Sequence, residues 1–106
     1  MNRQLQIDQF ALLAHQLAFE KLKAEPLRLN EVVQVLSSWK TRNGVTRADH
    51  LLTQWQVLLA GSMAQLEQVI TAATDKATLL RSVSPMSVLI TPLERTRLLK
   101  KVRDIT

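Results

Sequence analysis

The fold of this chain is decided between residues 52 and 80, which read LTQWQVLLAGSMAQLEQVITAATDKATLL. Within this stretch an apolar residue recurs every seven positions, and a second series fills the companion position of the same heptad. The first series is Leu52, Leu59, Leu66, Ala73 and Leu80, and the second is Met63, Ile70 and Ala77. Because a seven-residue apolar repeat keeps one face of a helix buried, the stretch predicts helix with a continuous apolar seam.

Gly61 and Ser62 interrupt the seam and allow two interpretations. Taken locally, Gly61 is typical of a residue that ends a helix, and Ser62 with Gln65 has the spacing of a capping box that starts another. A turn would ordinarily shift the register, whereas one glycine costs a continuous helix only about 1 kcal/mol. The unbroken register therefore favours one long helix over about residues 46–82, kinked at Gly61 if anywhere. Such a helix would extend roughly 55 Å and overhang a chain of this size, which indicates a partner.

Composition places this stretch within one all-α domain over residues 1–106. The 106 residues are 46% hydrophobic, which suits a single small core. Leucine occurs 19 times, alanine 10 times and glutamine 9 times, against 2 glycines, 3 prolines and no tyrosine. Helix formers therefore dominate over strand formers, and we expect a small helical bundle of four to five helices.

A first helix is expected over about residues 4–24, with apolar side chains spread around most of its circumference. This pattern is typical of the central helix of a bundle. Alternatively, Leu5, Leu12 and Phe19, spaced seven residues apart, form a side that meets a second copy of the chain. A second helix is predicted over about residues 30–42, where apolar residues share one face.

The last helix is predicted over about residues 92–104. Thr91, Pro92 and Glu94 have the residue types preferred at the N-cap, at the first helical position and at the third. Residues 86–90, before this helix, are apolar and fit either an extended connector or a single helical turn. The two tryptophans, Trp39 and Trp55, fall on the apolar faces of their helices and are expected in the core.

The sequence contains no arrangement of residues that indicates catalysis. It has no cysteine and 2 histidines, and its 2 glycines cannot form a phosphate-binding loop. The carboxylates are scattered along the sequence. His15 is interpreted as structural, and so are Asp49 and His50, which are neighbours in the sequence. We therefore expect no enzyme activity, no catalytic residue, no metal site, no cofactor and no small-molecule substrate. No signal segment or membrane-spanning stretch is apparent, so a cytoplasmic protein without membrane contact is the default.

The net charge of +5 is unevenly placed along the chain. Residues 48–80 carry a net charge of −2, whereas residues 95–103 hold five cations and no anion. In addition, residues 29–59 can be aligned with a helix-turn-helix, although Lys40 and His50 stand where such motifs pack small or aliphatic residues. The candidate nucleic-acid contacts are Lys40, Arg42, Arg47, His50, Gln54, Arg95, Arg97, Lys100, Lys101 and Arg103.

Two functions follow from these patterns. The leading hypothesis is a non-enzymatic interaction protein that forms a homo-oligomer or docks a protein partner through the heptad seam. The predicted interface consists of Leu52, Leu59, Met63, Leu66, Ile70 and Leu80. The alternative is a small basic DNA-binding regulator that uses the helix-turn-helix-like segment and the cations of the last helix.

Overall fold

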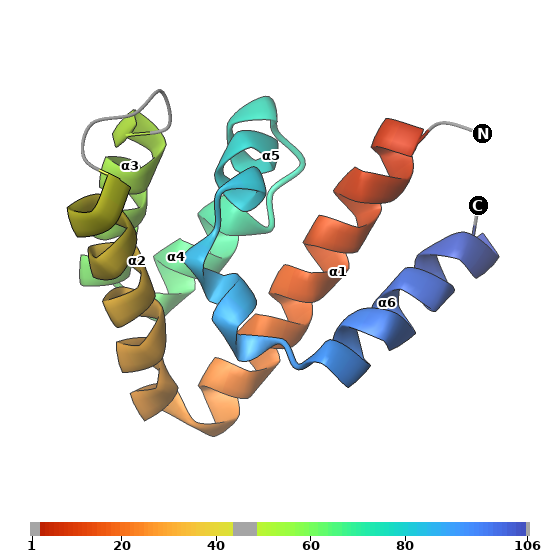
Figure 1. The fold of residues 1–106 in the computed structure, drawn as a ribbon, viewed down its shortest axis with the longest axis horizontal. Coiled ribbons are helices and arrows are strands. Elements are labelled where there is room, and N and C mark those ends of the chain that lie inside the picture. The colour runs from red at the N-terminus through yellow and green to blue at the C-terminus, as the bar shows by residue number, and fades with distance from the viewer. Residues whose placement is uncertain (1–2, 44–48, 106) are drawn as a thin grey trace.

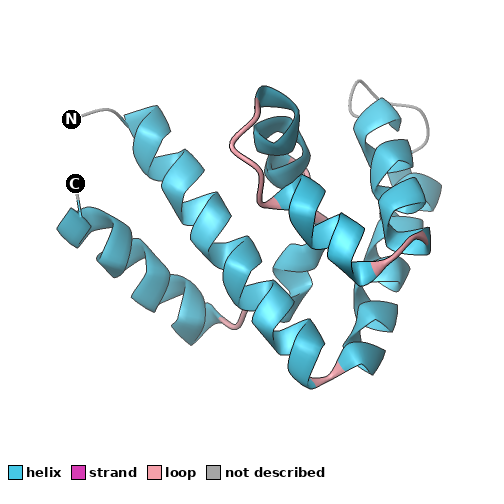
Figure 2. Ribbon diagram, turned by 180° about the vertical axis from the view of Figure 1, so that it is seen from behind, coloured by secondary structure: helices cyan, strands magenta, loops and turns pink. Residues whose placement is uncertain are grey.

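The computed structural model describes residues 3–43 and 49–105, and within them the chain forms only helices and connecting loops (Figures 1 and 2). The α-helices are α1 (Arg3–Ala24), α2 (Leu29–Asn43), α3 (Asp49–Ala60), α4 (Met63–Ile70), α5 (Asp75–Ser82) and α6 (Pro92–Ile105). Two 3₁₀ turns, η1 (Pro26–Arg28) and η2 (Pro85–Leu89), connect α1 to α2 and α5 to α6. The all-α prediction is confirmed, with six α-helices in the described part of the chain instead of four to five.

The prediction of one long helix over residues 46–82 is wrong, because the described part of this stretch forms three short helices. The first break follows α3, where Ser62 has extended backbone angles and its Oγ accepts a hydrogen bond from the Gln65 N–H at 3.1 Å. The second break precedes α5, where Thr74 Oγ1 accepts from the Ala77 N–H at 3.1 Å. The interpretation of Ser62 as the residue that caps a new helix is therefore confirmed. The whole chain measures 37 Å along its longest axis, well short of the expected overhang.

The apolar seam nevertheless keeps its function as a buried face. Each of the three short helices directs its own apolar residues of the seven-residue repeat toward a common core. The buried face therefore continues across the two connections between these helices. The buried members are Leu52, Leu59, Leu66, Ile70, Ala77 and Leu80, and Met63 is half-buried against them. Ala73 is exposed because it lies in the loop between α4 and α5. The residues assigned by sequence to an interface thus belong to the core of the chain itself and are not exposed to a partner.

Trp55 occupies the centre of this core. Its side chain is fully buried, and its indole Nε1 donates a hydrogen bond to the Leu80 carbonyl at 2.9 Å. The His15 ring stacks against it with ring centroids 6.3 Å apart. The expectation that Trp55 belongs to the core is confirmed, whereas Trp39 is only half-buried at its edge. Trp55 thereby connects α3 with both α1 and α5.

The short apolar run before α6 folds as the turn η2, which lies between α1 and α2 (Figure 1). Pro85, Met86 and Leu89 are buried there, so the turn fills the core rather than bridging over its surface. Ser84 accepts a hydrogen bond from the Met86 N–H at 3.0 Å and starts the turn. Of the two conformations left open by the sequence, the structure has the helical one.

The two caps in the 52–80 stretch give a stability prediction. Removing the hydroxyl in Ser62→Ala should lower the free energy of unfolding by about 1 kcal/mol, because the Gln65 N–H loses its partner. Gly61→Ala should cost little, since the backbone there is outside the left-handed region. The nearest neighbour of a Cβ would be the end of the Gln65 side chain, at 3.4 Å, with the carbonyl oxygens of Leu58 and Val57 at 3.6 and 3.9 Å. Urea unfolding monitored by circular dichroism measures both changes. A larger loss for Gly61→Ala than for Ser62→Ala would contradict this account of the break.

Candidate functional site

The described members of the candidate nucleic-acid contacts in α2 and α3 are not all exposed and free to bind. Lys40 Nζ donates to Thr53 Oγ1 at 2.9 Å and lies 4.0 Å from the Asp49 carboxylate, so part of its charge is used in joining α2 to α3. Gln54 is half-buried and its amide oxygen is buried. Arg42 and His50 are exposed, and Arg47 lies outside the described residues.

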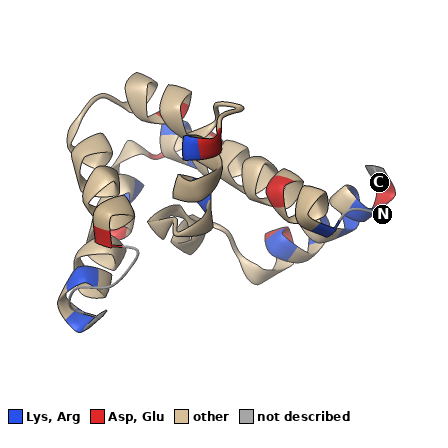
Figure 3. Ribbon diagram, turned by 90° about the horizontal axis from the view of Figure 1, so that it is seen from above, with Lys and Arg blue, Asp and Glu red and all other residues tan. Residues whose placement is uncertain are grey.

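The five cations of α6 are all exposed, and Figure 3 shows Lys and Arg positions in blue along the helix that ends at the C-terminus. Arg95 and Arg103 face a groove that α6 forms with α1, since both line it. The other three, Arg97, Lys100 and Lys101, do not line the groove. The structure therefore resolves the basic run of the sequence into a groove-lining pair and a separate cluster.

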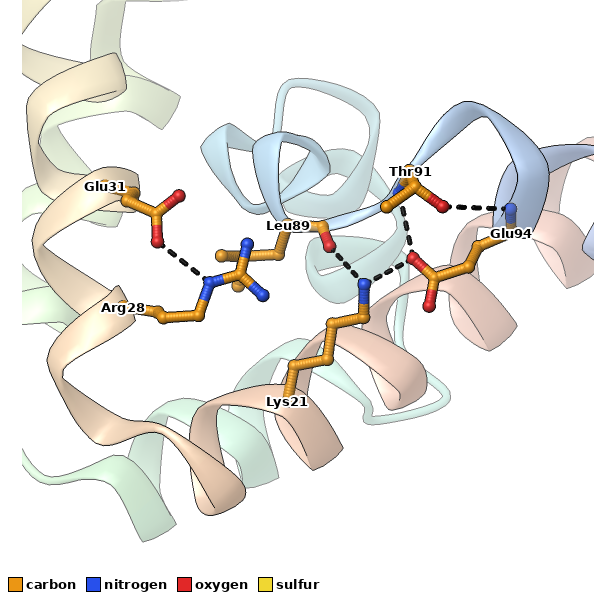
Figure 4. A network of polar contacts seen from close by, with 6 residues as sticks. All are labelled: Lys21, Arg28, Glu31, Leu89, Thr91 and Glu94. Atoms are coloured by element: carbon orange, nitrogen blue, oxygen red, sulfur yellow. Dashed lines mark hydrogen bonds and ion pairs between the residues drawn. The ribbon is translucent and has the colours of Figure 1, made fainter.

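A capping box and a lysine fix the start of α6 (Figure 4). The Thr91 N–H donates to Glu94 Oε1 at 2.9 Å, and Thr91 Oγ1 accepts from the Glu94 N–H at 3.2 Å, which confirms the predicted helix start. Lys21 of α1 adds a connection between the helices: its ammonium forms an ion pair with Glu94 and donates to the Leu89 carbonyl at 2.7 Å. The first turn of α6 is thereby attached to α1.

From this attachment α6 runs antiparallel beside α1 (Figures 1 and 2). Between the two helices lies a groove of about 520 Å³. Its lining residues come from one face of each helix, at i, i+3, i+4 and i+7 spacing on α1 and at i, i+4, i+7 and i+8 spacing on α6. They are Arg3, Gln6, Ile7 and Phe10 from α1, and Arg95, Leu99, Val102 and Arg103 from α6.

The groove combines an apolar floor with a cationic rim. Ile7 is 53% exposed and Leu99 47% exposed, although both are large apolar side chains. The Arg95 guanidinium lies over the Phe10 ring, 5.0 Å from its centroid, and so covers an aromatic surface while keeping its charge. Arg3 and Arg103 supply two more charges, and no carboxylate lines this groove. Such a surface attracts anionic groups and removes apolar ones from water.

Among the described residues, no three histidine or carboxylate side chains lie close enough together to hold a metal ion. Within the same ranges, none of the helices combines the length and apolar character needed to cross a membrane. No protein-family model, curated protein or solved structure matches the chain.

Sequence reasoning missed the groove because it depends on a pairing of distant segments. Lys21 and Glu94 are separated by 73 positions, and no local pattern predicts that they meet. A partial signal was present in the spacing of Arg3, Ile7 and Phe10, which puts a cation and two apolar side chains on one helical face. Arg81, which the structure buries, also gave no signal beyond its position beside the apolar seam.

The Lys21–Glu94 contact gives a pH-dependent prediction. Hydrogen bonds from Lys21 and from Thr91 lower the pKa of Glu94 from its ordinary value of 4.5 to about 2. A lowered carboxyl pKa stabilises the folded state above the unfolded pKa, and this contribution is lost as the pH falls through the folded pKa. Wild type should therefore be more stable than Glu94→Gln near neutral pH, and the difference should shrink between about pH 5 and pH 2.

Urea unfolding of both proteins across this pH range measures the difference. The matched control is the same pair of proteins carrying Lys21→Met, in which the pH dependence of the Glu94→Gln effect should be much smaller. An equal pH dependence with and without Lys21 would show that the ion pair does not hold α6.

Proposed function

We propose that this chain is a helical docking protein whose α1/α6 groove binds an acidic amphipathic helix of a partner protein. The observation that supports the proposal is the exposed apolar floor of Ile7 and Leu99 within a rim of three arginines. An apolar surface left open to water is typical of a binding site in a soluble domain. The positive charge of the three arginines at the rim favours an anionic partner. Protein–protein interaction thus remains the proposed function, as expected from the sequence, but the α1/α6 groove replaces the heptad seam as the binding surface.

The shape of the groove favours a helix as the occupant. Two antiparallel helices present parallel rows of side chains, and a third helix can place apolar residues between them in the same way that helices pack in a bundle. The lining residues span eight residues of α1 and nine of α6, which corresponds to about two turns of a partner helix. A partner with apolar residues at i, i+3, i+4 and i+7, flanked by Asp or Glu, fits both the floor and the rim.

A second copy of the chain fits this groove less well. In a two-fold symmetric dimer each groove would face the same surface of its partner, so Arg3, Arg95 and Arg103 of one copy would approach those of the other. The chain carries a net charge of +5, which adds to this repulsion. A partner of opposite charge avoids both costs.

Nucleic acid would use only part of the surface. Phosphates can pair with the arginines, but a polyanion would leave the exposed side chains of Ile7 and Leu99 without an apolar partner. The segment expected to read bases also contributes little, since Gln54 is half-buried and Lys40 is bonded to α3. Nucleic-acid binding is therefore the competing outcome of the experiment and not a second proposal.

The proposal predicts binding of a fluorescently labelled synthetic peptide, an acidic helix with leucine at i, i+3, i+4 and i+7 and glutamate elsewhere. Leu99→Asp should weaken binding at least tenfold, or about 1.4 kcal/mol, because it puts a charge in the apolar floor and repels the peptide. Arg103→Gln should weaken binding and reduce its dependence on salt. Val57→Asp is the matched control, since Val57 is 68% exposed on α3 and does not line the groove.

Fluorescence anisotropy gives the affinities, and a peptide with lysine in place of glutamate should not bind. Three results would overturn the proposal: no saturable binding by folded protein, equal affinity for duplex DNA that Leu99→Asp does not change, or a mass in solution showing that Leu99 holds two copies together. Each result assigns the groove differently, so the three are distinguishable.

A further inference from the structure

A second cavity, partly open to solvent, lies on the other side of Phe10 and Arg95. It measures about 320 Å³ and is bordered by α1, α5, η2, the edge of α2 and the start of α6. Its walls are mainly apolar and include Ala14, Trp39 and Met86. This volume lies at the lower end of the range of small-molecule sites, which are typically concave and apolar with a few polar groups. His15 and Arg81 are the two buried polar groups on its wall that carry an unpartnered nitrogen.

His15 presents an unused hydrogen-bond acceptor. The side chain is only 5% exposed, and its Nδ1 lies 2.6 Å from the Ala11 carbonyl oxygen. Because a carbonyl can only accept, the proton of the neutral ring is on Nδ1, and Nε2 carries a lone pair. Burial lowers the pKa of His15, which favours this neutral form. Nε2 is itself buried and has no hydrogen-bond partner.

Arg81 presents an unused donor and a charge that forms no direct ion pair. Its side chain is 8% exposed and donates to the carbonyls of Ile70 and Ala72, at 2.6 and 3.0 Å, and to Thr78. All these acceptors are neutral, and among the described residues no carboxylate lies within 4.0 Å of the guanidinium. The Nε–H is buried without a partner. Asp8 acts on this charge electrostatically without forming an ion pair with it. Burial of the cation is costly, and an anion in direct contact with the guanidinium would offset more of that cost.

We propose that this cavity binds a small hydroxylated aromatic carboxylic acid. The carboxylate accepts from the Arg81 Nε–H and balances its charge, and the hydroxyl donates to His15 Nε2. The aromatic body packs against Trp39 and Met86, which offer a ring face and a polarisable sulfur. The ligand thus uses both unpartnered nitrogens and the apolar wall, whereas a purely apolar ligand would leave the two nitrogens unpaired.

The test uses three matched probes: 4-hydroxyphenylacetate, phenylacetate without the hydroxyl, and 4-hydroxyphenylacetamide without the charge. Calorimetric titration of the full chain gives the affinities, and tryptophan fluorescence reports on the site because Trp39 lines the cavity and Trp55 stacks on His15. We expect saturable binding of 4-hydroxyphenylacetate and at least tenfold weaker binding of each analogue. Phenylacetate leaves His15 Nε2 without a donor, and the amide, whose carbonyl can still accept from the Arg81 Nε–H, brings no charge to pair with the guanidinium.

Two variants keep the test independent of Arg81, whose removal also takes hydrogen bonds from the end of α4. His15→Phe retains a ring but no acceptor, so 4-hydroxyphenylacetate and phenylacetate should bind it equally. Ala14→Leu fills the cavity and should abolish binding, whereas Ala64→Leu, at an exposed position of α4, should not change it.

The proposal fails if folded wild type binds none of the probes at millimolar concentration, which would leave the cavity to ordered water. It also fails if the three probes bind alike or if Ala14→Leu still binds. This outcome is separable from that of the docking groove. Leu99→Asp affects only the groove and should leave acid binding intact, and Ala14→Leu affects only the cavity and should leave peptide binding intact.

Discussion

The burial of the turn η2 between α1 and α2 is the constraint on which the rest of the structure depends. A turn of five residues exposes apolar side chains on more than one side, and here Met86 and Leu89 fill the core. Burial also requires partners for backbone groups that the turn does not satisfy itself. Ser84 accepts from the Met86 N–H, and the Lys21 ammonium donates to the Leu89 carbonyl. Because the same ammonium pairs with Glu94, placing the turn also places the start of α6.

Both candidate sites follow from that placement. Once its first turn is attached to α1, α6 lies along the N-terminal half of α1 and its basic side borders an apolar strip. The pair formed by Arg95 and Phe10 then separates the groove from the cavity, since both residues line both spaces. The groove is suited to a macromolecule, because its floor is open to solvent. The cavity is suited to a small molecule, because its polar nitrogens are enclosed.

How much of this was predictable depended on the range of the interaction involved. Patterns within a few residues were reliable: the capping box at Thr91 is present, and the Trp55 face is buried. The seven-residue repeat correctly marked the residues that face the core. It did not reveal where the helix is interrupted, because three short helices can bury the same series of apolar residues as one long helix. The cap at Thr74 was missed for that reason. The contact of Lys21 with Glu94 and the burial of Arg81 depend on tertiary packing, which spacing along the chain does not encode.

The central claim is that α6 is held against α1 in the free protein, so that Arg95 covers Phe10. Nuclear Overhauser effects between the Phe10 ring protons and the Arg95 side chain test it most directly, because such effects require protons within roughly the 6 Å range of a cation–π contact. The account predicts clear cross-peaks between these two side chains. Their absence, with α6 amides exchanging as fast as in an unfolded chain, would show that α6 is detached and would contradict the account.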